Sequence, residues 1–307
     1  MHTRRRFIQH STAAATLAAL APLLPTLSWA ADGSGLLRRK IPSTGEELPV
    51  IGLGTSRTFD VSLDPNDLAP LLEVVRTLAN GGATLVDTAP SYGNAERVTG
   101  ALAAQDNLRA RLFLASKVSS TGREAGLRQI EASFKDLKTD KIDLIQVHNL
   151  QDTSTQLALL RELKEQGRIR YIGITHYIDS AHDDLLRALE KDKVDFVQLN
   201  YSVGARNAEK RLLPFCADHG IATLINRPFQ RGELFAKVKD KPLPGWAQEL
   251  GATSWAQVML KFILAHPAVT AVIPATSKPR YMTDNLLAGH GQLPDARQRE
   301  RIIEVFA

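Results

Sequence analysis

The sequence has a single cysteine, Cys216, among its 307 residues. One thiol cannot form a disulfide within the chain, even in an oxidising compartment. Spacings of the H-x-H or H-E-x-x-H kind, which are typical of metal sites, are also missing. Stability must therefore come from a buried core, and a chain of this length can bury a large one.

Clusters of basic residues are missing from most of the chain. The formal net charge is +5, but three of the arginines stand in residues 1–30, which hold no acid, so residues 31–307 carry only +2. Aromatic residues make up 6% of the chain and are not interleaved with lysine or arginine. Nucleic acid is therefore not a predicted partner.

Residues 1–30 have the pattern of an export signal. Thr3-Arg-Arg-Arg-Phe-Ile8 gives the twin-arginine motif almost in full, the apolar run Ala13–Leu24 follows, and Ser28-Trp-Ala30 has small residues at the two positions read by signal peptidase. The run is too short, and too broken by proline, to span a bilayer as a stable helix. We predict a twin-arginine signal peptide cleaved after Ala30, passage through the twin-arginine export machinery with membrane contact only in transit, and a periplasmic or extracellular location.

Residues 31–307 alternate short apolar runs with segments of helical period, and we predict one domain. A Ser-Thr-Gly turn inside Leu36–Leu48 indicates a β-hairpin ahead of eight apolar runs. These runs are Val50–Leu53, Thr84–Val86, Leu112–Ala115, Ile142–Val147, Ile169–Ile174, Phe196–Leu199, Ile221–Ile225 and Val269–Ile273. Eight strands that alternate with helices predict an α/β fold, a closed (β/α)₈ TIM barrel. A doubly wound open sheet is the alternative, but the third glycine of a G-x-G-x-x-G fingerprint is missing after Gly54.

Three local signals predict where helices begin and where the chain is irregular. Thr121-Gly-Arg-Glu124 reads as a capping box, and the Asn94 side chain is placed to cap the helix that follows it. The stretch Arg227–Pro244, rich in Lys, Gly and Pro, is typical of a loop over the barrel mouth.

Polar residues follow most of the predicted strands. Because barrel enzymes build their sites at the C-terminal ends of the strands, these residues should share one pocket. They are Asp87, Lys117, His148, Thr175, His176, Gln198, Asn200 and Asn226.

Four of the groups in this region suggest carbonyl chemistry: Asp87, Tyr92, Lys117 and His148. A phenol titrates near pH ~10, and a neighbouring ammonium should lower that pKa. A carboxylate would keep the lysine charged, and the imidazole could hold the same oxygen as the phenol. Such a phenol could protonate a developing alkoxide.

The motifs in this region resemble those of the aldo-keto reductase family. Asp87-Thr-Ala-Pro-Ser-Tyr92-Gly-Asn-Ala-Glu96 matches the family's D-x-A-x-x-Y-G-x-x-E, and Ala115-Ser-Lys117 and Gln146-Val-His148 match its strand-end lysine and histidine. The similarity runs from Leu36 to about Gly289. It implies an NADPH-dependent reductase of aldehydes or ketones, with NADH as a possible cofactor. Tyr92 would donate the proton, Lys117 and Asp87 would adjust the pKa of Tyr92, and His148 would orient the carbonyl.

The resemblance also implies where the cofactor binds, with some departures from the family pattern. Gln198 would hold the nicotinamide carboxamide, Thr175-His176 replaces the usual Ser-Asn, and Asn226 stands where many members have a tyrosine that stacks on the nicotinamide. Tyr281 stands where an arginine often clamps the 2′-phosphate. The expected cofactor contacts are Gly54, Thr55, Thr175, His176, Gln198, Asn226, Arg227, Phe229, Thr276, Ser277, Lys278, Arg280 and Asn285.

Other readings remain open at this stage. A metal site at His148, His176 and Asp87 is disfavoured because Lys117 would add positive charge. A barrel hydrolase would need a second strand-end carboxylate beside Asp87. A non-catalytic periplasmic module that binds or senses nicotinamide nucleotides is the main alternative, because an exported enzyme has no obvious source of reduced cofactor. A monomer is the default, and Arg57, Phe59 and Trp246 are candidate substrate contacts.

Overall fold

The computed structural model describes residues 35–307. The predicted signal peptide, residues 1–30, lies outside the described residues, so export and cleavage remain predictions. No helix in residues 35–307 is both long enough and apolar enough to cross a membrane.

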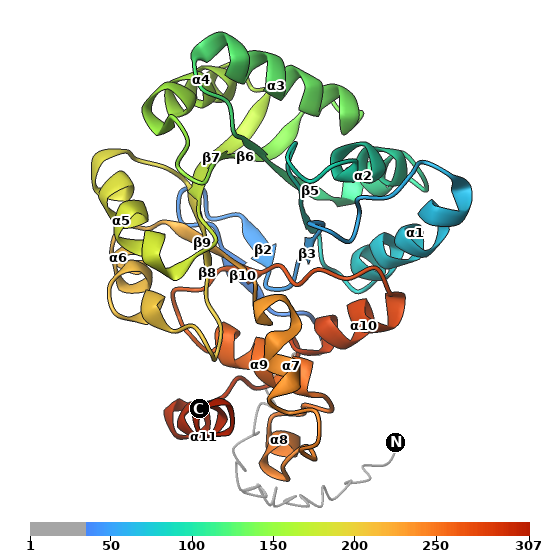
Figure 1. The fold of residues 1–307 in the computed structure, drawn as a ribbon, viewed down its shortest axis with the longest axis vertical. Coiled ribbons are helices and arrows are strands. Elements are labelled where there is room, and N and C mark those ends of the chain that lie inside the picture. The colour runs from blue at the N-terminus through green and yellow to red at the C-terminus, as the bar shows by residue number, and fades with distance from the viewer. Residues whose placement is uncertain (1–34) are drawn as a thin grey trace, which may run out of the picture. The chain divides into compact units, whose positions relative to one another are not determined.

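The strands form a two-stranded hairpin and an eight-stranded barrel (Figure 1). The hairpin pairs β1 (Arg38–Lys40) with β2 (Glu47–Pro49), and the barrel strands are β3 (Leu53–Gly54), β4 (Leu85–Asp87), β5 (Phe113–Val118), β6 (Ile142–His148), β7 (Ile169–Thr175), β8 (Phe196–Asn200), β9 (Ala222–Asn226) and β10 (Ala271–Val272). All neighbours in the barrel are parallel and follow chain order. Bridges from Ile51 to Val272 and from Gly54 to Ala275 join its two ends, which confirms the predicted barrel.

Helices surround the barrel strands (Figure 1). They are α1 (Pro65–Asn80), α2 (Ala95–Ala103), α3 (Arg123–Asp136), α4 (Thr153–Glu165), α5 (His182–Lys191), α6 (Leu212–Asp218), α7 (Glu233–Ala236), α8 (Trp246–Glu249), α9 (Trp255–Leu264), α10 (Pro279–Leu287) and α11 (Ala296–Phe306). Most of these helices pack their buried faces on the outside of the strands in one large apolar core.

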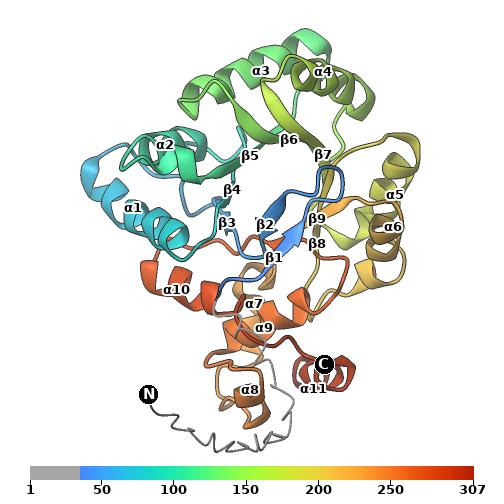
Figure 2. The same cartoon turned by 180° about the vertical axis from the view of Figure 1, so that it is seen from behind.

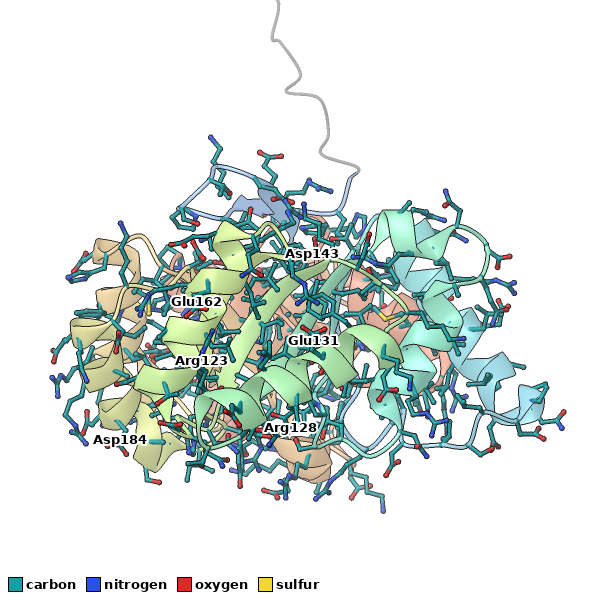
Figure 3. The ribbon with its side chains drawn as sticks, turned by 90° about the horizontal axis from the view of Figure 1, so that it is seen from above. Arg123, Arg128, Glu131, Asp143, Glu162 and Asp184 are labelled. Carbon is teal, nitrogen blue, oxygen red and sulfur yellow. The ribbon has the colours of Figure 1, made fainter. Side chains whose placement is uncertain are left out.

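Ion pairs link neighbouring helices on the outer surface. Arg123 of α3 lies 2.7 Å from Glu162 of α4. Both residues are labelled in Figure 3, which views the molecule from above. Both side chains are about half exposed, so the pair adds little to stability. The apolar contacts beneath these helices therefore position the barrel.

A second apolar cluster fills the barrel interior near the strand starts. The rings of Phe113, Tyr171 and Phe196 lie 5.4–6.2 Å apart, and Ile41 and Leu48 of the hairpin segment belong to the same cluster. The hairpin thus lies across the N-terminal end of the barrel, as Figure 2 shows from behind. Because this end is closed by packed side chains, a ligand has to enter from the other end.

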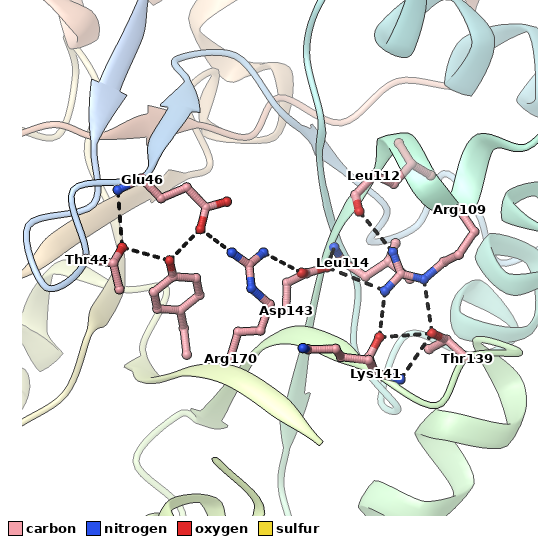
Figure 4. A network of polar contacts seen from close by, with 10 residues as sticks. Thr44, Glu46, Arg109, Leu112, Leu114, Thr139, Lys141, Asp143 and Arg170 are labelled. Atoms are coloured by element: carbon pink, nitrogen blue, oxygen red, sulfur yellow. Dashed lines mark hydrogen bonds and ion pairs between the residues drawn. The ribbon is translucent and has the colours of Figure 1, made fainter. Parts of the chain in front are cut away.

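Polar contacts fasten the hairpin to the strands (Figure 4). The Glu46 carboxylate accepts from Tyr171 Oη at 2.6 Å and from the Arg170 guanidinium, which also donates to Asp143 at 2.8 Å. Asp143 in turn accepts from the Leu114 amide at 2.8 Å. Burial raises the pKa of Tyr171 to about 12, with the Glu46 hydrogen bond adding to the effect, so this phenol stays protonated and serves structure.

Two of the predicted helix starts are wrong in detail. Helix α3 begins after Gly122, whose φ is +83°, and the predicted capping bond from the Thr121 side chain is not formed. Asn94 does stand at the N-cap of α2, but its side chain makes no capping bond. Instead its backbone N–H donates to Asp60 at 2.9 Å, so a contact between loops replaces the local cap.

Candidate functional site

The strand register brings several of the predicted polar residues into one layer. His148 of β6 stands beside Thr175 of β7, and Thr175 stands beside Gln198 of β8. On the other side, Asp87 of β4 pairs with Ala115 of β5, two positions before Lys117. Strand pairing alone therefore gathers these side chains at the C-terminal end of the barrel.

Asp87 is the centre of a buried hydrogen-bond network. One carboxylate oxygen lies 2.7 Å from Lys117 Nζ, and the other accepts from Gln198 Nε2 at 2.8 Å and from Gln146 Nε2 at 3.4 Å. Lys117 also donates to the Thr88 carbonyl at 2.9 Å. Both members of the ion pair are almost fully buried, so the network fixes their positions firmly.

Tyr92 lies at the cavity edge, between Lys117 and His148. The Lys117 ammonium is 4.9 Å from the centre of the phenol ring, and the imidazole of His148 meets that ring edge-on at 5.9 Å. Gly93, with φ +61°, allows the tight turn behind Tyr92, because a Cβ there would come within 2.5 Å of the Asp60 carboxylate. The loop conformation thus holds the phenol in place.

The charge states of these groups follow from burial and from each other. Burial raises the pKa of Tyr92, and the Lys117 ammonium lowers it only part of the way, so the predicted net lowering is wrong. Burial opposes the charge of Lys117, but Asp87 and Tyr92 raise its pKa above the ordinary value. Burial, with Lys117 and His176 adding to it, lowers the pKa of His148 to about 3. A protonated phenol, an ammonium and a neutral imidazole therefore meet at neutral pH.

A cavity of about 720 Å³ opens in front of Tyr92. It is lined by ten of the predicted residues, which come from the loops and strand ends around the barrel mouth. They are Gly54, Thr55, Asp87, Tyr92, His148, Thr175, Gln198, Asn226, Arg227 and Phe229. Within residues 35–307, His, Cys, Asp and Glu side chains form no group of three or more that could hold a metal ion.

The structure does not bring the other predicted residues to this lining: Lys117, His176, Asn200, Thr276, Ser277, Lys278, Arg280 and Asn285. Lys117 lies buried behind Tyr92 and Asp87. The His176 ring is turned back on its own chain, where Nδ1 accepts from the Tyr177 amide at 3.0 Å. Its carbonyl oxygen, rather than the ring, lies 3.5 Å from the Asn226 amide nitrogen.

The last five of these residues belong to the segment that leads from β10 into α10. Thr276 Oγ1 accepts from the Lys278 amide at 3.1 Å, just before α10 begins at Pro279. Lys278 Nζ and the Arg280 guanidinium lie 5.6 Å and 4.7 Å from the ring of Tyr281. Asn285 is buried inside the helix. Two cations are thus gathered on one exposed ring near a helix N-terminus, outside the main cavity.

Several lining residues were missed, and two substrate contacts were wrongly predicted. Phe59 is fully buried in the core, and Trp246 begins α8 away from the cavity, whereas Arg57 does line it. The predicted loop after β9 contains α7, and its Arg231 and Phe235 line the cavity, as does Tyr177 after β7. Only their position after strand ends could have indicated them.

The chain matches the model of the aldo/keto reductase family over residues 50–302. This match covers most of the chain, which therefore belongs to the aldo/keto reductase family, a class of NAD(P)H-dependent oxidoreductases. The aldo-keto reductase YhdN of Bacillus subtilis is 30% identical over 216 residues, which are 66% of this chain and 64% of that protein, just under two thirds. The methylglyoxal reductase YeaE of Escherichia coli is 28% identical over 237 residues, 75% of this chain and 82% of that protein.

Solved structures of the same family have the same fold. A thermostable aldo-keto reductase in complex with the inhibitor epalrestat matches with a TM-score of 0.73 and 27% identity, over 88% of this chain and 100% of that one. An aldo-keto reductase from Klebsiella pneumoniae in complex with NADPH matches with a TM-score of 0.72 and 23% identity, over 88% and 96%. At 23% identity, the similarity to the Klebsiella pneumoniae structure supports the fold alone.

Proposed function

We propose that this protein is an NADPH-dependent reductase that transfers hydride to an aldehyde or ketone. The observation that carries the proposal is the contact set of Tyr92, a phenol at the cavity edge with an ammonium 4.9 Å from its ring centre and a neutral imidazole edge-on at 5.9 Å. In this proposal, Tyr92 donates the proton to the carbonyl oxygen as the carbon atom accepts hydride.

The neighbours of Tyr92 have separate tasks. Lys117 is charged because Asp87 lies 2.7 Å away, and its positive charge favours the phenolate that forms when Tyr92 gives up its proton. Because its imidazole is neutral, His148 can donate one N–H to the carbonyl oxygen without adding a second positive charge. Asp87 itself is a positioning residue, since Lys117 and Gln198 saturate its oxygens.

The residues around the cavity fit a nicotinamide cofactor, which when bound supplies the hydride. Asn226 Oδ1 is buried beside the cavity and has no hydrogen-bond partner among residues 35–307, and a ligand amide N–H would satisfy it. Gln198 Oε1 lies 3.3 Å from Asn226 Nδ2, so the two side chains form one amide-binding edge. The nicotinamide carboxamide has donors and acceptors that suit this edge.

The start of α10 is the proposed site for the adenosine phosphates. Thr276 and Ser277 supply hydroxyls, Lys278 and Arg280 supply charge, and the positive end of the dipole of the nine-residue helix α10 favours an anion there. The two cations gathered at Tyr281 favour a further phosphate, and hence NADPH over NADH.

The proposal is tested by titrating NADPH and NADH into the purified chain and by following nucleotide oxidation with a panel of aromatic aldehydes and quinones. We expect tighter binding of NADPH than of NADH, and turnover with at least one carbonyl. Binding without turnover would favour the nucleotide-sensing alternative. Absence of binding would mean that Asn226, His176 and Tyr281 have removed the cofactor site.

We further propose export through the twin-arginine pathway, supported by the motif at Arg4-Arg5 and the apolar run after it. This pathway carries folded proteins, which suits a barrel that binds its cofactor before export. Fractionation of cells that make the wild type or the Arg4→Lys/Arg5→Lys variant is the test. Periplasmic accumulation of the wild type alone supports export, whereas retention of both in the cytoplasm contradicts it.

A further inference from the structure

The mouth of the cavity carries more positive than negative charge. Arg57, Arg227 and Arg231 line it, whereas the lining acids are Asp60 and Asp87. The charge of Asp87 is matched by Lys117 at 2.7 Å. Asp60 is thus left as the one lining carboxylate, among the described residues, to balance three guanidinium groups.

Two of these arginines have free guanidinium groups. Within residues 35–307, the side chains of Arg57 and Arg231 make no hydrogen bond and no ion pair, in contrast to that of Arg227, which donates to the Tyr177 carbonyl at 3.1 Å. Both also stand on left-handed backbone, with φ of +65° and +58°. This conformation costs a non-glycine residue about 1 kcal/mol or more and often occurs where a ligand is held.

The turn that carries Arg57 is attached to the catalytic loop at two points. At its start, the amide and hydroxyl of Thr55 donate to the Asp87 carbonyl at 3.0 and 2.9 Å. At its end, Asp60 accepts from the Asn94 amide, two residues after Tyr92. Arg57 therefore belongs to the side of the cavity where the carbonyl group reacts, while Arg227 and Arg231 lie on the segment after β9.

We propose that the site prefers carbonyl compounds that carry a carboxylate, and that Arg57 binds this group. The proposal rests on the proposed reductase function and names its substrate class. A guanidinium donates two parallel N–H bonds to a carboxylate, which gives both affinity and orientation. The phosphates of the cofactor are a second source of negative charge. Arg227 and Arg231 stand on either side of the expected cofactor contact Phe229, so they are placed to bind these phosphates.

The test compares 4-formylbenzoate with its neutral methyl ester, using the full chain and NADPH. The ratio of kcat/KM for the acid to that for the ester is measured in the wild type and in Arg57→Met. We expect this ratio to fall about fivefold, the effect of one charge-assisted contact at an exposed position. The kcat/KM for the ester and the Kd for NADPH should stay within about twofold, and the wild-type ratio should fall at high salt.

Arg128→Met is the matched control. Arg128 is an exposed arginine on the outer face of α3 (Figure 3), so this variant removes the same charge outside the cavity. An unchanged ratio in Arg57→Met would overturn the inference, as would an equal fall in Arg128→Met. Weaker NADPH binding in Arg57→Met with equal losses for both aldehydes would assign the arginine to a cofactor phosphate. If the ester too is not reduced by the wild type, the reductase function itself fails.

Discussion

At the scale of single residues, burial decides how Tyr92 behaves. A phenol beside an ammonium in water would have a lowered pKa, but Tyr92 is largely removed from water, and desolvation outweighs the attraction of Lys117. The phenol is therefore protonated at every physiological pH, as a proton donor has to be. The role of Lys117 is then to favour the phenolate once the proton has left.

This balance predicts the pH profile of carbonyl reduction. The kcat/KM should be constant from about pH 5 to 9 and should fall only at alkaline pH, above the ordinary phenol value of about 10. His148, whose pKa is lowered to about 3, should add no acidic limb in this range. Initial rates at saturating NADPH check this, and a limb near pH 6.5 would show that His148 titrates in the active enzyme.

Glu96 is a buried carboxyl next to the site, and it predicts a pH-dependent stability. Its oxygens accept from Ser116 Oγ at 2.5 Å and from Ser133 Oγ at 3.1 Å, yet burial raises its pKa from 4.5 to about 7. Between these two values the folded state holds a proton that the unfolded state has lost. The contribution of Glu96 to the free energy of unfolding should therefore be full below about pH 4.5, fall by roughly 3 kcal/mol as the pH rises to 7, and stay level above it.

Urea unfolding of the wild type and Glu96→Gln at pH 5 and pH 8 measures this effect, with all other titrating groups shared by the two proteins. The amide keeps the size and neutrality of the protonated acid, so the variant should gain on the wild type at pH 8. A stability difference that does not change with pH would mean that Glu96 is already ionised at pH 5.

At the scale of elements, close packing of helices depends on one glycine. Alanine normally favours a helix over glycine by about 0.5–1 kcal/mol, but a Cβ on Gly100 of α2 would lie 2.1 Å from the Asp136 carbonyl oxygen of α3. We predict that Gly100→Ala destabilises the fold by about 1–3 kcal/mol. Gly126→Ala is the comparison, because its Cβ would meet only the end of the Gln156 side chain. Equal stability of Gly100→Ala and the wild type in chemical unfolding would contradict this packing.

The sequence predicted most of the elements and fewer of the loops. All eight barrel strands and the hairpin followed from apolar runs and a turn motif, because strand burial leaves a local pattern. The contacts of Tyr177 and Phe235 at the cavity did not, because loop conformation depends on distant partners. For the same reason Phe59 and Trp246 were misplaced, and Asn94 is held by Asp60 instead of capping its own helix.

At the scale of the whole barrel, the two ends have different tasks. The N-terminal end is filled by aromatic rings and fastened by the Glu46 and Arg170 contacts, whereas the C-terminal end holds the cavity and the buried charges. Strand-end residues could be predicted as one site because parallel strands bring their C-terminal ends together. Their net pKa values could not, since burial depends on packing from all sides.

The measurement that tests the central claim most directly is single-turnover oxidation of bound NADPH by an aromatic aldehyde in the wild type and in Tyr92→Phe. Phenylalanine keeps the ring contacts with Lys117 and His148 and removes the hydroxyl group that would donate the proton. The account predicts a rate at least about 100-fold lower with the Kd for NADPH unchanged, the effect of losing a positioned acid. A Tyr92→Phe variant that oxidises NADPH at the wild-type rate would contradict it.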